Sequence, residues 1–143
     1  MATLQSALEE IMRMVARIPG IQKAPALPPE SLGVFPYAVG YPGSGELDNA
    51  PPDVMTGLHD VVLEVHVARK DLPADAARVL PYAVAVPAAL YLALQDGHFR
   101  SLQTFRTITY QFGGMAYNGI QTLGYRFTLQ GVKIQSNIEE QQV

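Results

Sequence analysis

The chain has 143 residues, no cysteine, and a net charge of −3 from 10 basic and 13 acidic residues. This length predicts one domain, residues 1–143, that can bury a core without cross-links. The absence of a basic excess argues against a dedicated nucleic-acid binder, and the absence of cysteine excludes disulfides and thiolate chemistry. Charged residues make up 16%, against about 25% in an average soluble domain, so we expect part of the surface to face partners.

The N-terminal half predicts one helix and two strands. Spacings of three and four between apolar residues indicate a helix over Leu4–Ile18, which Thr3 can cap. Gly33–Tyr41 is typical of a strand, and Pro36 within it favours an edge position, because proline cannot donate a ladder hydrogen bond. The polar segment Pro42–Gly57 predicts a long projecting loop, a candidate for contacts outside the chain.

The segment Leu58–Lys70 alternates in a way that predicts a half-buried strand. Its apolar face comprises His59, Val61, Leu63, Val65 and Val67, and its expected solvent-exposed face comprises Asp60, Val62, Glu64, His66 and Ala68.

The segment Asp71–Asp96 predicts helix, with Asp71 as a plausible N-cap. Pro81 and Pro87 each remove an amide donor, so we expect a kinked helix or two shorter helices. The stretch from Val79 to Gln95 carries no charge, and we expect it to be buried in the core or against a neighbouring subunit. The longest apolar stretch, Val79–Leu94, is interrupted by these prolines and is shorter than the ~20 residues that a bilayer needs, which argues against a membrane span.

The remaining segments complete a small α+β fold. Thr104–Phe112 and Gln121–Ile134 predict a strand pair, with turn residues at Gly113-Gly114 and Asn118-Gly119, and the tail 136–143 is expected to fray. The order α-β-β-α-β-β predicts a mostly antiparallel four-stranded sheet with helices packed on one face.

No pattern in the chain predicts catalysis, a metal site or a cofactor. Glu64 and His66 share a strand face with Asp60, but a zinc site needs three or four converging ligands, and the chain has three histidines with no helical His-x-x-x-His pair. Gly43-Ser44-Gly45 lacks the lysine and spacing of a phosphate-binding loop, and no Gly-x-Ser-x-Gly elbow occurs. We therefore expect no enzymatic activity and no cofactor.

Three stretches resemble the tail terminator proteins of long-tailed, non-contractile phages. They are the N-terminal helix leading through a proline-rich link into FPYAVGY, the strand and broken helix LHDVVLEVHVARKDL and RVLPYAVAVPAALYLAL, and the closing hairpin ITYQFGGMAYNGIQTLGYRFTLQGVKI. The resemblance implies a hexameric ring that caps the tail tube, stops tube polymerisation and offers a surface for head–tail joining. It further implies a virion protein, made in the host cytoplasm and located at the tail end near the neck. The implied partners are other copies of the chain, the tail tube protein and a head-side connector protein.

In such a ring, the polar face of the sheet can meet the next subunit or line the channel. The candidate interface residues are Asp60, Glu64, His66, Lys70, Arg106 and Arg126.

Two alternatives remain open. One is another head–tail connector or neck component of the same virion, and the other is a small α+β ligand-binding domain or enzyme that uses Glu64 and His66.

Overall fold

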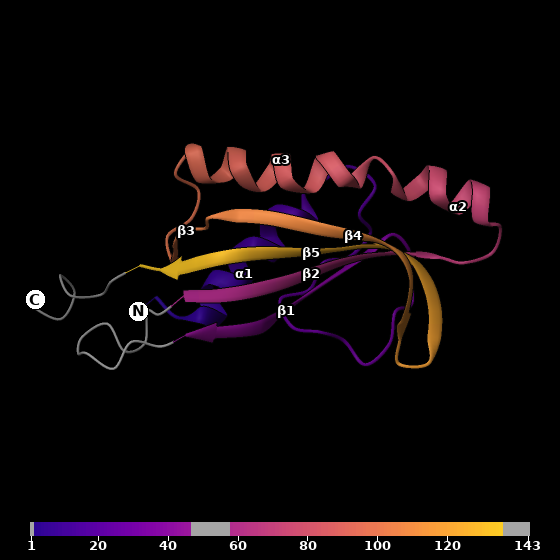
Figure 1. Ribbon diagram of the computed structural model, residues 1–143, viewed down its shortest axis with the longest axis horizontal. Coiled ribbons are helices and arrows are strands. Elements are labelled where there is room, and N and C mark those ends of the chain that lie inside the picture. The colour runs from indigo at the N-terminus through magenta and orange to yellow at the C-terminus, as the bar shows by residue number, and fades with distance from the viewer. Residues whose placement is uncertain (1, 47–57, 136–143) are drawn as a thin grey trace, which may run out of the picture.

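The computed structural model describes residues 2–46 and 58–135 as an α+β fold built on one antiparallel sheet (Figure 1). The elements in chain order are α1 (Leu4–Ala16), β1 (Tyr37–Glu46), β2 (Leu58–Ala68), α2 (Leu72–Val79), α3 (Tyr82–Gln95), β3 (Leu102–Thr104), β4 (Thr107–Tyr117) and β5 (Ile120–Ile134). β1 pairs with β2, and β2 pairs with β5. The other side of β5 pairs with both β4 and the short β3. The α+β prediction is confirmed, with β3 as a strand that the sequence did not indicate.

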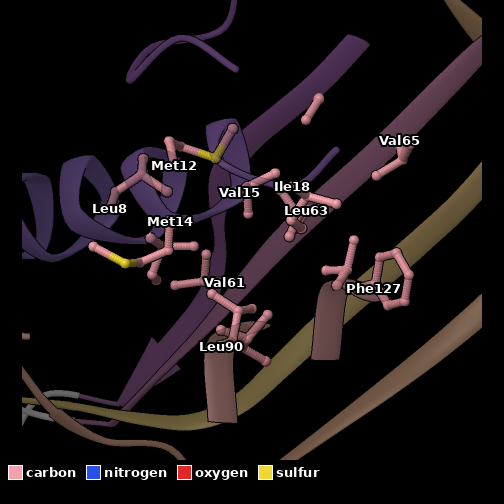
Figure 2. Packing of buried hydrophobic residues seen from close by; sticks show 14 of the residues in the cluster. Leu8, Met12, Met14, Val15, Ile18, Val61, Leu63, Val65, Leu90 and Phe127 are labelled. Atoms are coloured by element: carbon pink, nitrogen blue, oxygen red, sulfur yellow. The ribbon is translucent and has the colours of Figure 1, made fainter. Parts of the chain in front are cut away.

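Helix α1 packs its apolar side on the sheet as its periodicity predicts. Thr3 and Ser6 form a capping box at its start, and Arg17 follows its last residue. Figure 2 shows the buried side chains of this helix against those of β2, with Leu90 of α3 completing the cluster. Because α1 and α3 both pack on this face and on each other, they form a helical layer over it.

The helical segment divides at Pro81. α2 ends at Val79, and α3 begins directly after Pro81, which has no amide hydrogen to continue the helical ladder. α3 accommodates Pro87 in its interior. Asp71 lies at the expected N-cap, but its side chain makes no capping hydrogen bond. The buried carboxylate of Asp75 instead accepts the backbone N–H groups of residues 70 and 71 at 2.6 and 2.9 Å.

The edge-strand prediction for the first strand is confirmed, but the strand is shifted. β1 begins after Pro36 and continues through Pro42 to Glu46, with a register irregularity between Pro42 and Gly45. Of the loop expected over 42–57, residues 42–46 thus belong to β1, and the remainder lies outside the described residues, as does the tail 136–143.

The closing hairpin turns at only one of the two predicted positions. Asn118 and Gly119 both have positive φ, 49° and 85°, as a two-residue type I′ turn requires. Gly113 and Gly114 lie within β4 and pair with Gly124 and Leu123, so the turn predicted there is wrong. Gly113-Gly114 does not specify a turn, because glycine also occurs inside strands where the strand must bend or approach a neighbour closely.

The β4–β5 hairpin curls away from the plane of the sheet, as Figure 1 shows at its turn. Tyr117 lies two strands and about four residues from His66 in the sheet register, yet their rings meet edge to face at 5.8 Å. The hairpin therefore folds over the sheet face opposite α1 and α3. The connector before β1 joins this cover, because Tyr117 Oη donates to the Pro29 carbonyl and Asn118 Nδ2 donates to the Glu30 carbonyl at 2.8 Å.

The helical run Leu72–Gln95 is long and apolar enough, by length and composition, to cross a membrane. It spans 24 residues, and an 18-residue window within it has a mean hydropathy of 1.6 and is 28% buried. The sequence argument against a span counted only Val79–Leu94, whereas α2 extends the run at its start. Helices in the cores of water-soluble proteins meet the same criterion.

Gly124 is required where β5 approaches β2. A Cβ atom at Gly124 would lie 1.7 Å from the Val65 carbonyl oxygen, whereas a Cβ at its cross-strand partner Gly113 meets nothing within 4 Å. We expect Gly124→Ala to lower the free energy of unfolding by about 3 kcal/mol or to prevent folding, since backbone must move. Gly113→Ala is the matched control and should change stability by less than about 1 kcal/mol in urea unfolding. Equal effects of the two variants would contradict the close approach.

Candidate functional site

A buried polar network joins three adjacent strands on the face beneath the curled hairpin. Its members, called here the polar network, are Tyr41 of β1, Glu64 and His66 of β2, and Thr122 and Arg126 of β5. Glu64 and His66 share a face because they are two residues apart on one strand. Arg126 is the register partner of Glu64, so pairing of β2 with β5 places its guanidinium beside the carboxylate.

The Glu64 carboxylate is the centre of the polar network. Oε2 accepts from Tyr41 Oη at 2.5 Å and from Arg126 Nε at 3.0 Å, and Oε1 accepts from His66 Nε2 at 2.8 Å. Three strands thus donate to one carboxylate, and because this acceptor is ionised all three hydrogen bonds are charge-assisted. Removing any one donor would leave this buried acceptor poorly satisfied.

The hydrogen bonds outweigh the effect of burial on Glu64. Burial alone would raise the pKa of this carboxyl, but the bonds from His66, Tyr41 and Arg126 lower the pKa to about 2. Burial and the bond to the Glu64 carboxylate together raise the pKa of Tyr41 to about 12. Glu64 is therefore ionised and Tyr41 is neutral across the physiological pH range.

His66 links the carboxylate to a hydroxyl. Because an ionised carboxylate only accepts, Nε2 carries the proton toward Glu64, and in the neutral ring Nδ1 accepts from the Thr122 hydroxyl at 2.6 Å. A hydroxyl, an imidazole and a carboxylate in series also occur in nucleophilic catalysis. Here His66 and Thr122 are both 0% exposed and Tyr117 lies against the imidazole, so the hydroxyl does not face solvent.

The expectation that Glu64 and His66 lie on a solvent-exposed face is wrong. They are 5% and 0% exposed, because the hairpin and the connector cover this part of the sheet. The opposite face of β2 is buried as predicted, with Val61, Leu63, Val65 and Val67 at 0%. Alternation identified two faces of the strand but could not show that a distant hairpin covers the second.

The structure brings together only three of the six candidate interface residues, Glu64, His66 and Arg126. Arg126 remains half exposed, with 47% of its side chain accessible. Asp60 is partly exposed and accepts from Ser44 Oγ at 3.3 Å, whereas the side chains of Lys70 and Arg106 lie in the exposed connections before α2 and β4.

Sequence reasoning missed Tyr41 and Thr122 as partners of Glu64 and His66. Their residue types allow hydrogen bonding, but nothing in their spacing indicates that β1 and β5 flank β2 on opposite sides. The described residues contain no group of three or more histidine or acidic residues placed to hold a metal ion.

A second buried carboxylate anchors α1 to the start of β3. Glu10 is 8% exposed and accepts the backbone N–H groups of residues 100, 101 and 102 at distances from 2.9 to 3.2 Å. Ser6 Oγ donates to Ser101 Oγ at 2.7 Å in the same contact. These bonds satisfy backbone donors that would otherwise be buried without partners, which is a structural function.

The outer surface of the helical segment is apolar and accessible. Leu80, Val84, Tyr91 and Leu92, called here the outer apolar face, are 53%, 73%, 41% and 57% exposed. α3 directs Tyr82, Val86, Leu90 and Ala93 into the protein. The sequence predicts that the uncharged stretch Val79–Gln95 is buried in the core or against a neighbouring subunit. The core of this chain buries only one side of α3.

Comparisons with family models, curated proteins and solved structures find no significant match for this chain.

The polar network should make the free energy of unfolding depend on pH between about 4.5 and 2. Since the pKa of Glu64 is lowered from 4.5 to about 2, its ionised form contributes roughly 3 kcal/mol, which is complete above pH 4.5 and is lost as pH falls toward 2. We expect Glu64→Gln to destabilise the protein at pH 7, with the difference from wild type shrinking over that range in urea unfolding.

Asp60→Asn is the matched control, because Asp60 lies on the same strand face but is partly exposed. A Glu64→Gln variant whose pH profile parallels that of wild type would show that the carboxylate is not stabilised by these bonds.

Proposed function

We propose that this chain is a structural virion protein of the phage tail terminator type, forming a ring that caps the tail tube and provides the head-joining surface. The proposal starts from the resemblance of its three sequence stretches to that family. The observation that carries it is the outer apolar face, whose four apolar side chains are between 41% and 73% exposed on a segment that carries no charge from residue 79 to residue 95.

A ring-forming subunit needs a surface that binds a different surface of the next copy. When such a head-to-tail contact closes on itself, it makes a ring and no free site is left for further addition. In this proposal α3 supplies one side of that contact. Its 14 residues, Tyr82–Gln95, carry no charged side chain whose desolvation would oppose association.

The buried polar network fits this function better than it fits catalysis. Its hydroxyl and imidazole are covered, and its bonds join β1, β2 and β5. In a ring that bears load between a head and a tail, such bonds would keep the subunit rigid. The ring is proposed to contact the tail tube protein on one side and a head-side connector on the other, without a cofactor.

The test is to delete the gene for this chain from the phage that encodes it and to examine the particles that the mutant makes. We expect heads and tail tube protein to form, with tails that overrun their normal length or fail to join heads in electron micrographs. Tails of normal length joined to heads would contradict the proposal. Tails of correct length that stay unattached, beside heads that leak DNA, would instead indicate a neck or connector component.

A charged residue on the outer apolar face should block assembly and leave the fold intact. We expect Leu92→Asp to abolish rescue of the deletion by expressed protein, while circular dichroism and unfolding stay near wild type because Leu92 is 57% exposed. Leu27→Asp is the matched control, since Leu27 is 60% exposed in the connector before β1, and it should rescue fully. Full rescue by Leu92→Asp would exclude α3 from the ring contact.

A further inference from the structure

Strand β4 has one open side in the described part of the chain. It pairs with β5 along its whole length, and no described strand pairs with its other side. The Asn118-Gly119 turn closes with a hydrogen-bonded pair, Tyr117 and Ile120, so alternate residues back along β4 bond to β5. The residues between them direct their N–H and C=O groups to the open side: Ile108, Tyr110, Phe112, Gly114 and Ala116.

The other sheet edge is protected against pairing, whereas β4 is not. On β1, the Ala38 N–H donates outward to the Lys23 carbonyl at 2.9 Å, so Gly40 and Pro42 also direct their backbones outward. Pro42 lacks the donor there, and the irregular register that follows bends the edge further. β4 contains no proline and no charged residue over its 11 positions, Thr107–Tyr117.

Two of these five residues of β4, Tyr110 and Phe112, carry accessible aromatic side chains. Tyr110 and Phe112 are 57% and 46% exposed, and their rings lie 5.4 and 5.2 Å from the ring of Tyr125 on β5. An uncharged strand with an unpaired backbone and exposed aromatic rings is a template for another strand.

We propose that β4 pairs antiparallel with β4 of a second copy of this chain, about a two-fold axis through Gln111. This register places Tyr110 of one copy opposite Phe112 of the other, an aromatic cross-strand pair that stabilises sheets. Because β4 is uncharged, the two-fold contact brings no like charges together. The protected edge of β1 cannot serve as the partner, which leaves β4 itself as the complementary edge. The pairing rests on the strand edge alone and is independent of the proposed ring contact through α3.

A single cysteine tests the register directly, because the chain has none of its own. Gln111 bonds to β5, so across the new contact it forms a non-hydrogen-bonded pair with Cα atoms about 4.5 Å apart, within the range of a disulfide. We expect oxidised Gln111→Cys to yield a covalent dimer on non-reducing gels. Gln121→Cys, an exposed glutamine on β5, is the control and should stay monomeric on the gel.

Sedimentation equilibrium tests the contact without cross-linking. Wild-type protein should contain a species of twice the 15.5 kDa chain mass, and Phe112→Lys should reduce its association constant at least tenfold. Val34→Lys, at a residue 42% exposed in the connector, should leave the association unchanged.

Two results would overturn the pairing. One is a purely monomeric wild type together with no cross-link through position 111, and the other is an oligomer that Phe112→Lys does not weaken. In the second case, an oligomer that Leu92→Asp dissociates would assign the contact to α3, so failure of the β4 contact is distinguishable from failure of the ring.

Discussion

The structure depends on one buried carboxylate that must be fully hydrogen-bonded. Glu64 takes donors from β1, β2 and β5 at once, so its ionised form is compatible only with an arrangement in which these three strands are adjacent and correctly registered. If β2 slipped by one residue in register, the Glu64 carboxylate would move to the apolar face that the helices cover. There it would be buried among apolar side chains without these hydrogen-bond donors. The polar network therefore specifies the pairing of the sheet, while the apolar contacts of α1 and α3 supply most of the burial.

Covering that carboxylate determines the shape of the rest of the sheet. The hairpin curls over the polar face, and Gly124 permits β5 to approach the backbone of β2 as closely as the curl demands. Tyr117 and Asn118 then fasten the turn to the proline-rich connector. The same curl draws the turn end of β4 away from the plane of the sheet (Figure 1). Tyr110 and Phe112, farther from the turn, remain accessible.

Among the described residues, α3 and β4 both keep accessible apolar side chains after the core is complete, and the way the helices are built explains those of α3. The proline break lets α2 and α3 follow the sheet, so one side of α3 is buried with α1 and the strands, and the opposite side is left outward with Val84 and Leu92 accessible. An ordinary surface helix would carry charges there. Neither α3 nor β4 contains a charged residue, and both carry accessible apolar side chains. For this reason both are proposed as contact surfaces.

The sequence by itself determined the local elements, because their signals lie within a few residues. Apolar periodicity identified α1 and β2, Pro81 divided α2 from α3, and Asn118-Gly119 specified the hairpin turn. The α+β class followed from their order. The spacing of Glu64 and His66 also showed that they share a strand face. Only the tertiary structure decided that this face is buried and that Tyr41, Thr122 and Arg126 converge on it. The reason is physical: alternation along one strand sets which side chains point together, whereas their partners and their cover come from strands and a hairpin whose register is fixed by contacts far away in the chain.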